Sequence, residues 1–313
     1  MNDGLPHAGT VVTVEQISYH GWPECFLLSN GIVEAVVVPA ISRVMHFGLA
    51  GEPQSAFWQN RALDGQLPSV DSSEWSNFGG DKCWPAPQSD WPQQTGRAWP
   101  PPPALDALPA QAAAVARGVV LTSPMDLAYG IQMVRTVLLD PIHPVLRIET
   151  EFRKLQGPDV TVAIWTITQL CEPERILLWQ PATSRFPHGY LPLLDAEPAE
   201  FRSRGRLLSL KRHPSLFIKI GSDAGSMAWV GKSSVLRIDA ETGPGEYPDG
   251  GCVTEVYTNP DPLKYVELET LGPLVKISVG GQIRRTTTYT LMPRRGQDAE
   301  SVAEAPSFEA EVG

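Results

Sequence analysis

The sequence is poor in cysteine, in positive charge and in long hydrophobic runs, and each scarcity argues against a class of protein. The four cysteines are scattered and form no Cys-x-x-Cys pair, so we expect buried free thiols in a reducing compartment rather than a zinc site or a disulfide framework. Lys and Arg total 25 against 35 Asp and Glu, and this net charge of -10 disfavours nucleic acid and anionic membranes as partners. No apolar run approaches the roughly 20 residues of a membrane helix. Residues 1–10 are polar and lack a signal-peptide pattern, so we expect a cytoplasmic protein.

Several sequence motifs that indicate a particular catalytic reaction are also missing. The chain has no Gly-x-Ser-x-Gly, no His-Glu-x-x-His and no Gly-rich phosphate loop after a predicted strand. The histidines at 7, 20, 143 and 213 have no carboxylate or cysteine partner at metal-ligand spacing. We therefore expect neither a metal nor a cofactor.

What the sequence does contain is a long series of short apolar and β-branched runs separated by Gly, Pro, Asn and Asp. Runs such as Ile131–Leu139 and Tyr265–Leu271 recur at short intervals from residue 118 onward. This spacing predicts an all-β sandwich. Asn30-Gly31 lies between two apolar runs and predicts a two-residue type I′ hairpin. Residues 104–116 are rich in alanine and give the one helix of note that we expect, interrupted at Pro109.

We predict a single domain over residues 1–293, followed by an acidic tail. A hydrophobic fraction of 42% is enough for a sizeable core, and all-β domains often exceed 200 residues. Residues 294–313 contain few large apolar side chains and several Glu, so we expect them to be flexible.

The stretch at residues 76–92 combines a Gly-Gly pair with charge, amides and tryptophan. Two indoles next to a carboxylate, an ammonium group and two amides suit a sugar, which presents a flat apolar face and hydroxyl groups. An equally weighted interpretation is a rigid loop, anchored by tryptophan and rich in proline, that serves stability. The candidate sugar-binding residues here are Asn77, Asp81, Lys82, Trp84 and Gln88.

Polar side chains also share faces of two predicted strands. In Tyr265–Leu271 the period of two places Glu267 and Glu269 on one face, where their repulsion can raise the pKa of one of them, as in a general base or an acid–base pair. The alternative is a solvent face on which both are ionised. Trp165 and Gln169 share a face of the run at residues 160–170, either as sugar platform and amide donor or as core with one satisfied polar group.

His188 lies in a predicted loop with Arg185 and Tyr190. Loops on a rigid scaffold often carry binding groups, which makes His188 a candidate catalytic residue. A surface loop without a role is the alternative.

Residues 77–88 and 265–273 together resemble the signature of a bacterial family of unknown function within the galactose mutarotase-like superfamily, which includes aldose 1-epimerases. The segment from Asn30 to Arg43 and residues 165–169 fit the same resemblance, which spans most of residues 11–293. It implies a β-supersandwich of two large, curved, mostly antiparallel sheets with a sugar-sized groove on the concave one. Glu269 stands where the enzymes of that superfamily carry their general base. Phe78, however, stands before the Gly-Gly pair where those enzymes have a histidine, and residues 164–169 contain none.

The resemblance therefore implies a carbohydrate-binding protein for a monosaccharide or oligosaccharide, and an aldose 1-epimerase if it is catalytic. Glu269 would remove the anomeric proton, and His188, Lys82 or a protonated Glu267 would donate to the ring oxygen. Arg43, Lys82 and Arg185 could also bind a phosphorylated or acidic sugar, although surface basic residues usually have no role so specific. Two alternatives are a non-catalytic sugar-binding or sensing domain and a glycoside-cleaving enzyme that uses Asp81 with Glu269.

Overall fold

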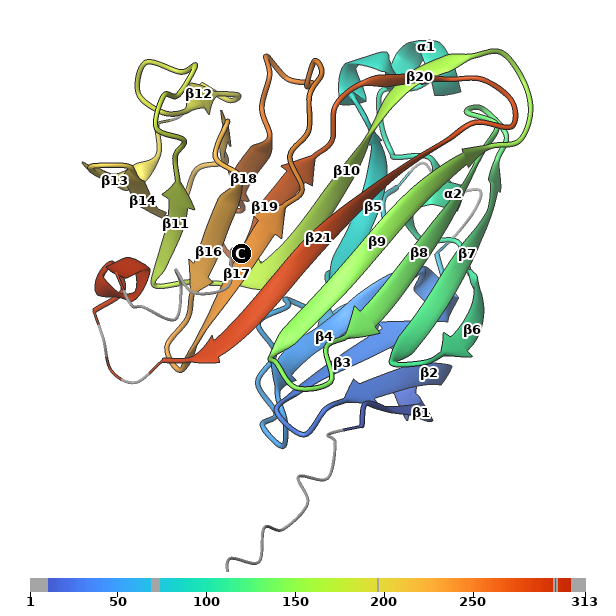
Figure 1. Ribbon diagram of the computed structural model, residues 1–313, viewed down its shortest axis with the longest axis horizontal. Helices are drawn as coiled ribbons and strands as arrows, with labels where there is room; N and C mark the ends of the chain where they lie inside the picture. Colours follow the sequence, from blue (N-terminus) through green and yellow to red (C-terminus); the bar gives the residue numbers. More distant parts are fainter. Residues whose placement is uncertain (1–10, 69–73, 196, 295, 297, 305–313) are drawn as a thin grey trace, which may run out of the picture.

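The computed structural model describes residues 11–68, 74–195, 197–294, 296 and 298–304 and consists mainly of two large antiparallel sheets (Figure 1). The first sheet has 11 strands, and β20 (Val275–Ile277) joins it by pairing with β10. The other strands follow in the spatial order β1 (Thr13–Tyr19), β2 (Trp22–Ser29), β3 (Val33–Val38), β4 (Arg43–Leu49), β5 (Asp81–Ala86), β10 (Val160–Cys171), β19 (Tyr265–Leu271), β18 (Thr254–Thr258), β15 (Ile218–Ser222) and β12 (Leu191–Pro192).

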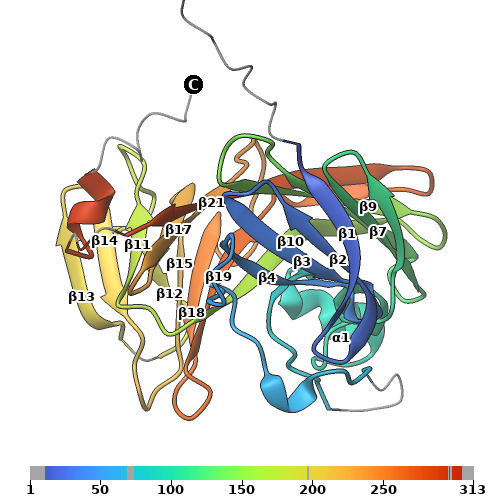
Figure 2. The ribbon, with the colours of Figure 1, turned by 90° about the horizontal axis from the view of Figure 1, so that it is seen from below.

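The second sheet has 10 strands and packs on the first (Figure 2). Its order is β13 (Ala199–Arg204), β14 (Leu207–Lys211), β11 (Arg175–Trp179), β16 (Ser226–Val230), β17 (Ser234–Ala240), β21 (Gln282–Pro293), β9 (Val145–Lys154), β8 (Ile131–Leu139), β7 (Gly118–Asp126) and β6 (Gln111–Val115). The prediction of an all-β sandwich is confirmed, and β8 and β19 have the predicted bounds.

The helices are short. They are α1 (Trp91–Thr95), α2 (Pro103–Asp106) and the 3-10 turns η1 (Pro39–Ile41), η2 (Arg61–Leu63), η3 (Gln88–Asp90) and η4 (Ser301–Glu304). No helix in the described ranges is long and apolar enough to cross a membrane. All four cysteines are free; Cys25, Cys83 and Cys252 are buried and Cys171 is partly buried.

The main core lies between the sheets because alternate side chains of each strand point inward. Leu28 and Val266 of the first sheet and Ile148 and Leu236 of the second belong to one buried cluster. A second cluster lies beneath α1 and contains indoles whose ring centroids are close: 5.7 Å for Trp75 and Trp84, 5.6 Å for Trp84 and Trp91, and 5.3 Å both for Trp84 and Trp165 and for Trp75 and Trp99.

The predicted helix at residues 104–116 is wrong. The helix α2 ends at Asp106, and Gln111–Val115 forms the edge strand β6, paired with β7. Alanine has a high helix propensity, but tertiary contacts readily override propensity, and Pro109 separates the two halves. Pairing with the long neighbouring strand β7 therefore decides the conformation of the second half.

The hairpin at Asn30-Gly31 forms, but its turn is wider than predicted. Ser29 pairs with Glu34, so four residues lie between the paired positions, and Gly31 has a positive φ whereas Asn30 does not. The Asn30 side chain shapes the turn instead, because its Oδ1 accepts hydrogen bonds from the backbone N–H groups of Ile32 and Val33, both at 2.9 Å.

The interpretation of residues 76–92 as a loop is wrong at its centre, which forms the inner strand β5. Within the described residues, β4 pairs with β5 only where Val44 lies opposite Asp81. The end of β5 that contains Pro85 therefore has one neighbouring strand, β10. Proline has no N–H to donate, and it is accepted here because the other side of the strand has no partner among the described residues that would need one.

Part of the segment expected to be a flexible tail packs on the second sheet. Ala299 and Val302 are buried in a small cluster with Leu177 and Val230. Residues 305–313 lie outside the described residues.

Candidate functional site

Three neighbouring strands, β5, β10 and β19, position the predicted polar residues. Ile167 of β10 lies opposite Lys82 on one side and opposite Glu269 on the other, so the three side chains share a face. Thr168 lies opposite Asp81 and Leu268, which share the other face, toward the second sheet. We refer to the face that carries Lys82, Glu267 and Glu269 as the site face.

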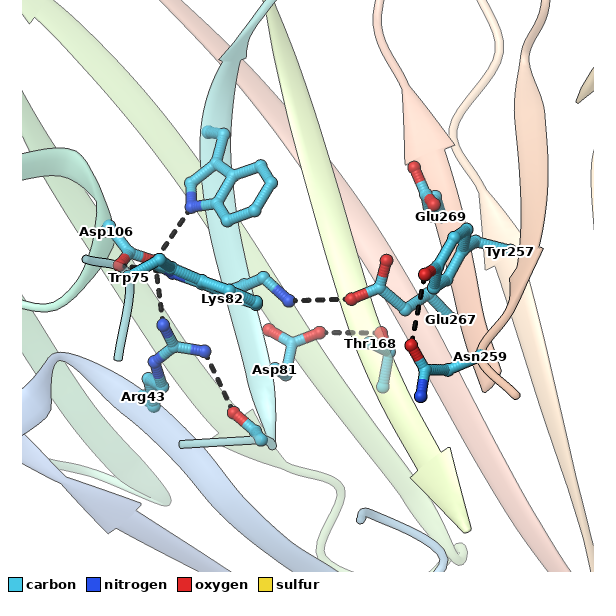
Figure 3. A network of polar contacts seen from close by, with 12 residues as sticks. Arg43, Trp75, Asp81, Lys82, Asp106, Thr168, Tyr257, Asn259, Glu267 and Glu269 are labelled. Atoms are coloured by element: carbon cyan, nitrogen blue, oxygen red, sulfur yellow. Dashed lines mark hydrogen bonds and ion pairs between the residues drawn. The ribbon is translucent and has the colours of Figure 1, made fainter. Parts of the chain in front are cut away.

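An ion pair between Lys82 and Glu267 lies at the centre of the site face (Figure 3). Lys82 Nζ is 3.1 Å from Glu267 Oε1, and 5.3 and 5.0 Å from the ring centroids of Trp75 and Trp84. Burial lowers the pKa of Lys82, and the carboxylate of Glu267 opposes this effect. The Lys82 side chain is fully buried, whereas 12% of the Glu267 side chain is exposed, so the carboxylate is the member of the pair that a ligand can reach.

Asp106 holds the two indoles that flank Lys82. Its Oδ1 accepts hydrogen bonds from Arg43 Nη2 at 2.7 Å and from Trp84 Nε1 at 2.8 Å, and its Oδ2 accepts one from Trp75 Nε1 at 3.0 Å. Arg43 is fully buried and also donates to the Gly79 carbonyl at 2.9 Å. Arg43 therefore positions this part of the face rather than presenting its charge to a ligand.

Glu269 lies deeper, in a second charged cluster. It is 1% exposed, and its Oε2 accepts a hydrogen bond from Trp165 Nε1 at 2.7 Å and lies 3.3 Å from Lys219 Nζ. Lys219 also lies 2.7 Å from Oε2 of Glu255, which is opposite Glu269 in the register of β18 and β19. The Lys219 ammonium is 4.7 Å from the ring centroid of Trp165, and 21% of its side chain is exposed.

The two carboxyl groups around Lys219 change each other's protonation. Burial raises the pKa values of Glu269 and Glu255, although Lys219 opposes this. Burial would lower the pKa of Lys219, but Glu269 and Glu255 outweigh it and raise that pKa. The sequence-based expectation that one carboxyl of the Glu267 and Glu269 pair has a raised pKa is met at Glu269, although burial is the main cause and repulsion from Glu267 a smaller one.

Aromatic rings border the site face beyond Glu267. The ring centroids of Trp58 and Tyr265 are 4.6 Å apart, those of Tyr257 and Tyr265 are 6.2 Å apart, and the Tyr257 hydroxyl donates to Asn259 Oδ1 at 3.1 Å. Burial raises the pKa values of both tyrosines, and Glu267 adds to this. Two predicted amides, Asn77 and Gln169, lie beside the Tyr265 hydroxyl, where each acts to lower its pKa.

Three predicted site residues lie away from the site face. Asp81 is buried on the opposite face, where it accepts hydrogen bonds from Thr168 at 2.7 Å and Tyr289 at 2.5 Å and pairs with Arg135. His188 is exposed in the loop between β11 and β12, and its described ring contact is with Tyr190. Gln88 is exposed in η3.

Sequence reasoning missed several residues of the site. Trp75 directly precedes the stretch at residues 76–92, whereas Asp106, Lys219 and Glu255 lie outside both motifs, and the pairing of β15, β18 and β19 brings the last two to Glu269. Within the described part of the chain, no three His, Cys, Asp or Glu side chains are grouped so that they could hold a metal ion.

Comparisons with known proteins identify the architecture. No protein-family model and no curated protein sequence matches the chain. A galactose mutarotase-like protein from Lactobacillus casei matches in structure with a TM-score of 0.58 and 9% identity, covering 86% of this chain and 100% of that one. A galactose mutarotase related enzyme from Lactobacillus acidophilus matches with a TM-score of 0.55 and 8% identity, over 88% and 99% of the two chains. A galactose mutarotase-like protein from Clostridium acetobutylicum matches with a TM-score of 0.52 and 7% identity, over 91% of this chain and 99% of that one.

These identities are too low to carry an activity from one protein to another, but the coverage is nearly complete on both sides. The resemblance of the sequence motifs and the arrangement of the two large antiparallel sheets agree with these matches. The chain therefore has the galactose mutarotase-like fold.

Proposed function

We propose that this chain binds a neutral carbohydrate on the site face. The observation that carries the proposal is the Lys82–Glu267 ion pair, which is partly open to solvent at Glu267 and lies between the indoles of Trp75 and Trp84 and the phenol of Tyr257. Aromatic faces pack against the C–H groups of a sugar ring, and a carboxylate accepts hydrogen bonds from its hydroxyl groups.

The charges of the site face favour a neutral ligand. The three cations described at this site already have carboxylate partners: Lys82 has Glu267, Arg43 has Asp106, and Lys219 has both Glu255 and Glu269. A phosphorylated or acidic sugar would have to compete with these carboxylates and approach Glu267 against its charge.

A panel of neutral aldoses, ketoses and small oligosaccharides tests this proposal, first by thermal shift and then by calorimetry on the sugars that stabilise the chain. We expect Glu267→Gln to bind the selected sugar at least about tenfold more weakly, because a neutral amide oxygen replaces the charged acceptor of the hydrogen bond. Glu200→Gln is the matched control, since Glu200 forms an ion pair with Lys211 at 2.9 Å in the second sheet. A panel without any hit, or equal affinity in Glu267→Gln and native protein, would contradict the proposal.

A second candidate function is aldose 1-epimerisation with Glu269 as the general base. The raised pKa of Glu269 favours this function, because a carboxylate that holds a proton more tightly is a better base near neutral pH. In this reaction Glu269 takes the proton of the anomeric hydroxyl and the bond between C1 and the ring oxygen breaks. Glu267, the member of the ion pair that a ligand can reach, passes a proton from Lys82 to that oxygen. Rotation about the C1–C2 bond presents the other face of the aldehyde, the former ring oxygen adds to C1, and return of both protons gives the other anomer.

Polarimetry of anomer interconversion separates this activity from binding alone. We expect Glu269→Gln to keep sugar binding and to lose roughly 10²–10⁴-fold in rate if Glu269 is the base. A native rate equal to the buffer rate, or equal rates in the two proteins, would leave the chain as a binding protein. The burial of Glu269 is the reason why binding is the first of the two proposals.

A further inference from the structure

A cavity of about 130 Å³ lies away from the site face. Ile164 lines it, and Ile164 alternates with Trp165 in β10, so the cavity belongs to the face of the first sheet that looks toward the second. Arg285 of β21 and Gly272 complete a buried floor, whereas residues 241–243 and Val275 form an exposed rim. The cavity therefore opens to solvent and ends at a guanidinium group.

The guanidinium of Arg285 has no carboxylate partner among the described residues. Arg285 is 5% exposed, and its Nε and Nη2 atoms are buried without a hydrogen bond. The fully buried arginines Arg43 and Arg135 each form an ion pair, with Asp106 and Asp81. Buried charges are normally paired, so Arg285 is an exception that requires an explanation.

The surroundings of Arg285 leave room for a partner of opposite charge. Thr150, its neighbour across β9 and β21, has a buried hydroxyl without a hydrogen bond. A Cβ added to Gly272 would lie 3.4 Å from Arg285 Nη1, so glycine at this position leaves the guanidinium uncovered. Tyr247 and Glu241 favour its charged form, but burial outweighs them and lowers the pKa of Arg285.

We propose that this cavity binds a small oxyanion, a carboxylate or a phosphate group, through the guanidinium of Arg285. The planar fork of N–H donors in arginine matches both groups. About 130 Å³ corresponds to roughly four water volumes, which suits an ion of this size. Glu241, the acidic residue of the rim, is exposed, and its Oε2 already accepts a hydrogen bond from the Thr286 amide at 2.8 Å, so solvent screens its repulsion.

Calorimetry on the full chain tests the site with sodium phosphate and with sodium acetate, each against sodium chloride at equal ionic strength. We expect saturable binding of at least one anion; a response to phosphate alone or to acetate alone identifies the class. Arg285→Met replaces the guanidinium by an apolar side chain and should weaken binding at least about tenfold, with thermal stability in the absence of anion unchanged or raised. Arg147→Gln, on the exposed side of β9, is the control and should bind like the native chain.

No binding of either anion to the native chain would overturn the proposal, as would equal binding in Arg285→Met. If Arg285→Met does not fold, Arg285→Lys takes its place. This variant keeps the charge and loses the fork, so its binding should be about tenfold weaker, and unchanged binding would refute the role of the guanidinium.

Discussion

Replacing Asp81 by Asn should destabilise the fold and leave sugar binding unchanged. The sequence motif places Asp81 beside Lys82, but the side chain points between the sheets, where Arg135, Thr168 and Tyr289 contact it. The amide keeps the volume of the side chain and removes its charge. Arg135, which is fully buried, then has no ionic partner.

The size of the effect follows from that burial. Removing one partner of a buried ion pair costs about 3–5 kcal/mol in the free energy of unfolding. An unfolding entropy of about 2.1 cal/mol/K per residue gives about 0.66 kcal/mol/K for 313 residues, so Tm should fall by about 5–8 °C.

Calorimetric unfolding and sugar titration on the same protein check both halves of this prediction. The double variant Asp81→Asn with Arg135→Met removes both charges and should recover more than half of the lost stability. A fall in Tm below about 2 °C for the single variant would show that the pair is not the anchor described above. A loss of sugar affinity with unchanged Tm would return Asp81 to the binding site.

Two further predictions concern stability. Burial, with a smaller effect of His20, lowers the pKa of His46 to about 4, so His46 is neutral in the folded chain and becomes charged on unfolding below its ordinary pKa of 6.5. Its contribution is complete above pH 6.5 and is lost as the pH falls toward 4; urea unfolding should show a loss of up to about 2 kcal/mol at pH 5 that is absent in His46→Gln. If the free energy of unfolding depends on pH equally in the native chain and in His46→Gln, this role of His46 is refuted. Gly79 and Gly31 both have a positive φ, but an added Cβ would lie 2.2 Å from the Trp58 carbonyl oxygen at Gly79 and meets nothing within 4 Å at Gly31. Gly31→Ala should therefore cost about 1–2 kcal/mol and Gly79→Ala more than about 3 kcal/mol in urea unfolding, and similar costs would refute the role of the contact.

The sequence predicts local pattern well and long-range pairing poorly. The alternation in Tyr265–Leu271 predicts both the bounds of β19 and the shared face of Glu267 and Glu269, because the period of two is a local property. The charged neighbours of Glu269 could not be predicted, because Lys219 and Glu255 reach it through the pairing of β15, β18 and β19.

Two local signals also misled the interpretation. The prolines around β5 suggest a loop, yet this segment forms a strand. It pairs with β10 along its length but with β4 at one position, so few of its N–H groups are needed on that side. Successive residues of a strand point to opposite faces, so Asp81 faces the core and Lys82 the site face. A motif that suggests a single site is therefore divided between the two faces.

The cluster of indoles beneath α1 gives the molecule an optical reporter of its own. Trp75, Trp84, Trp91, Trp99 and Trp165 lie in successive ring contacts, close enough for excitation energy to pass from one ring to the next. Trp75 and Trp84 also contact the ammonium of Lys82. We therefore expect a ligand bound beside Lys82 to change the fluorescence of the whole group, without any attached dye.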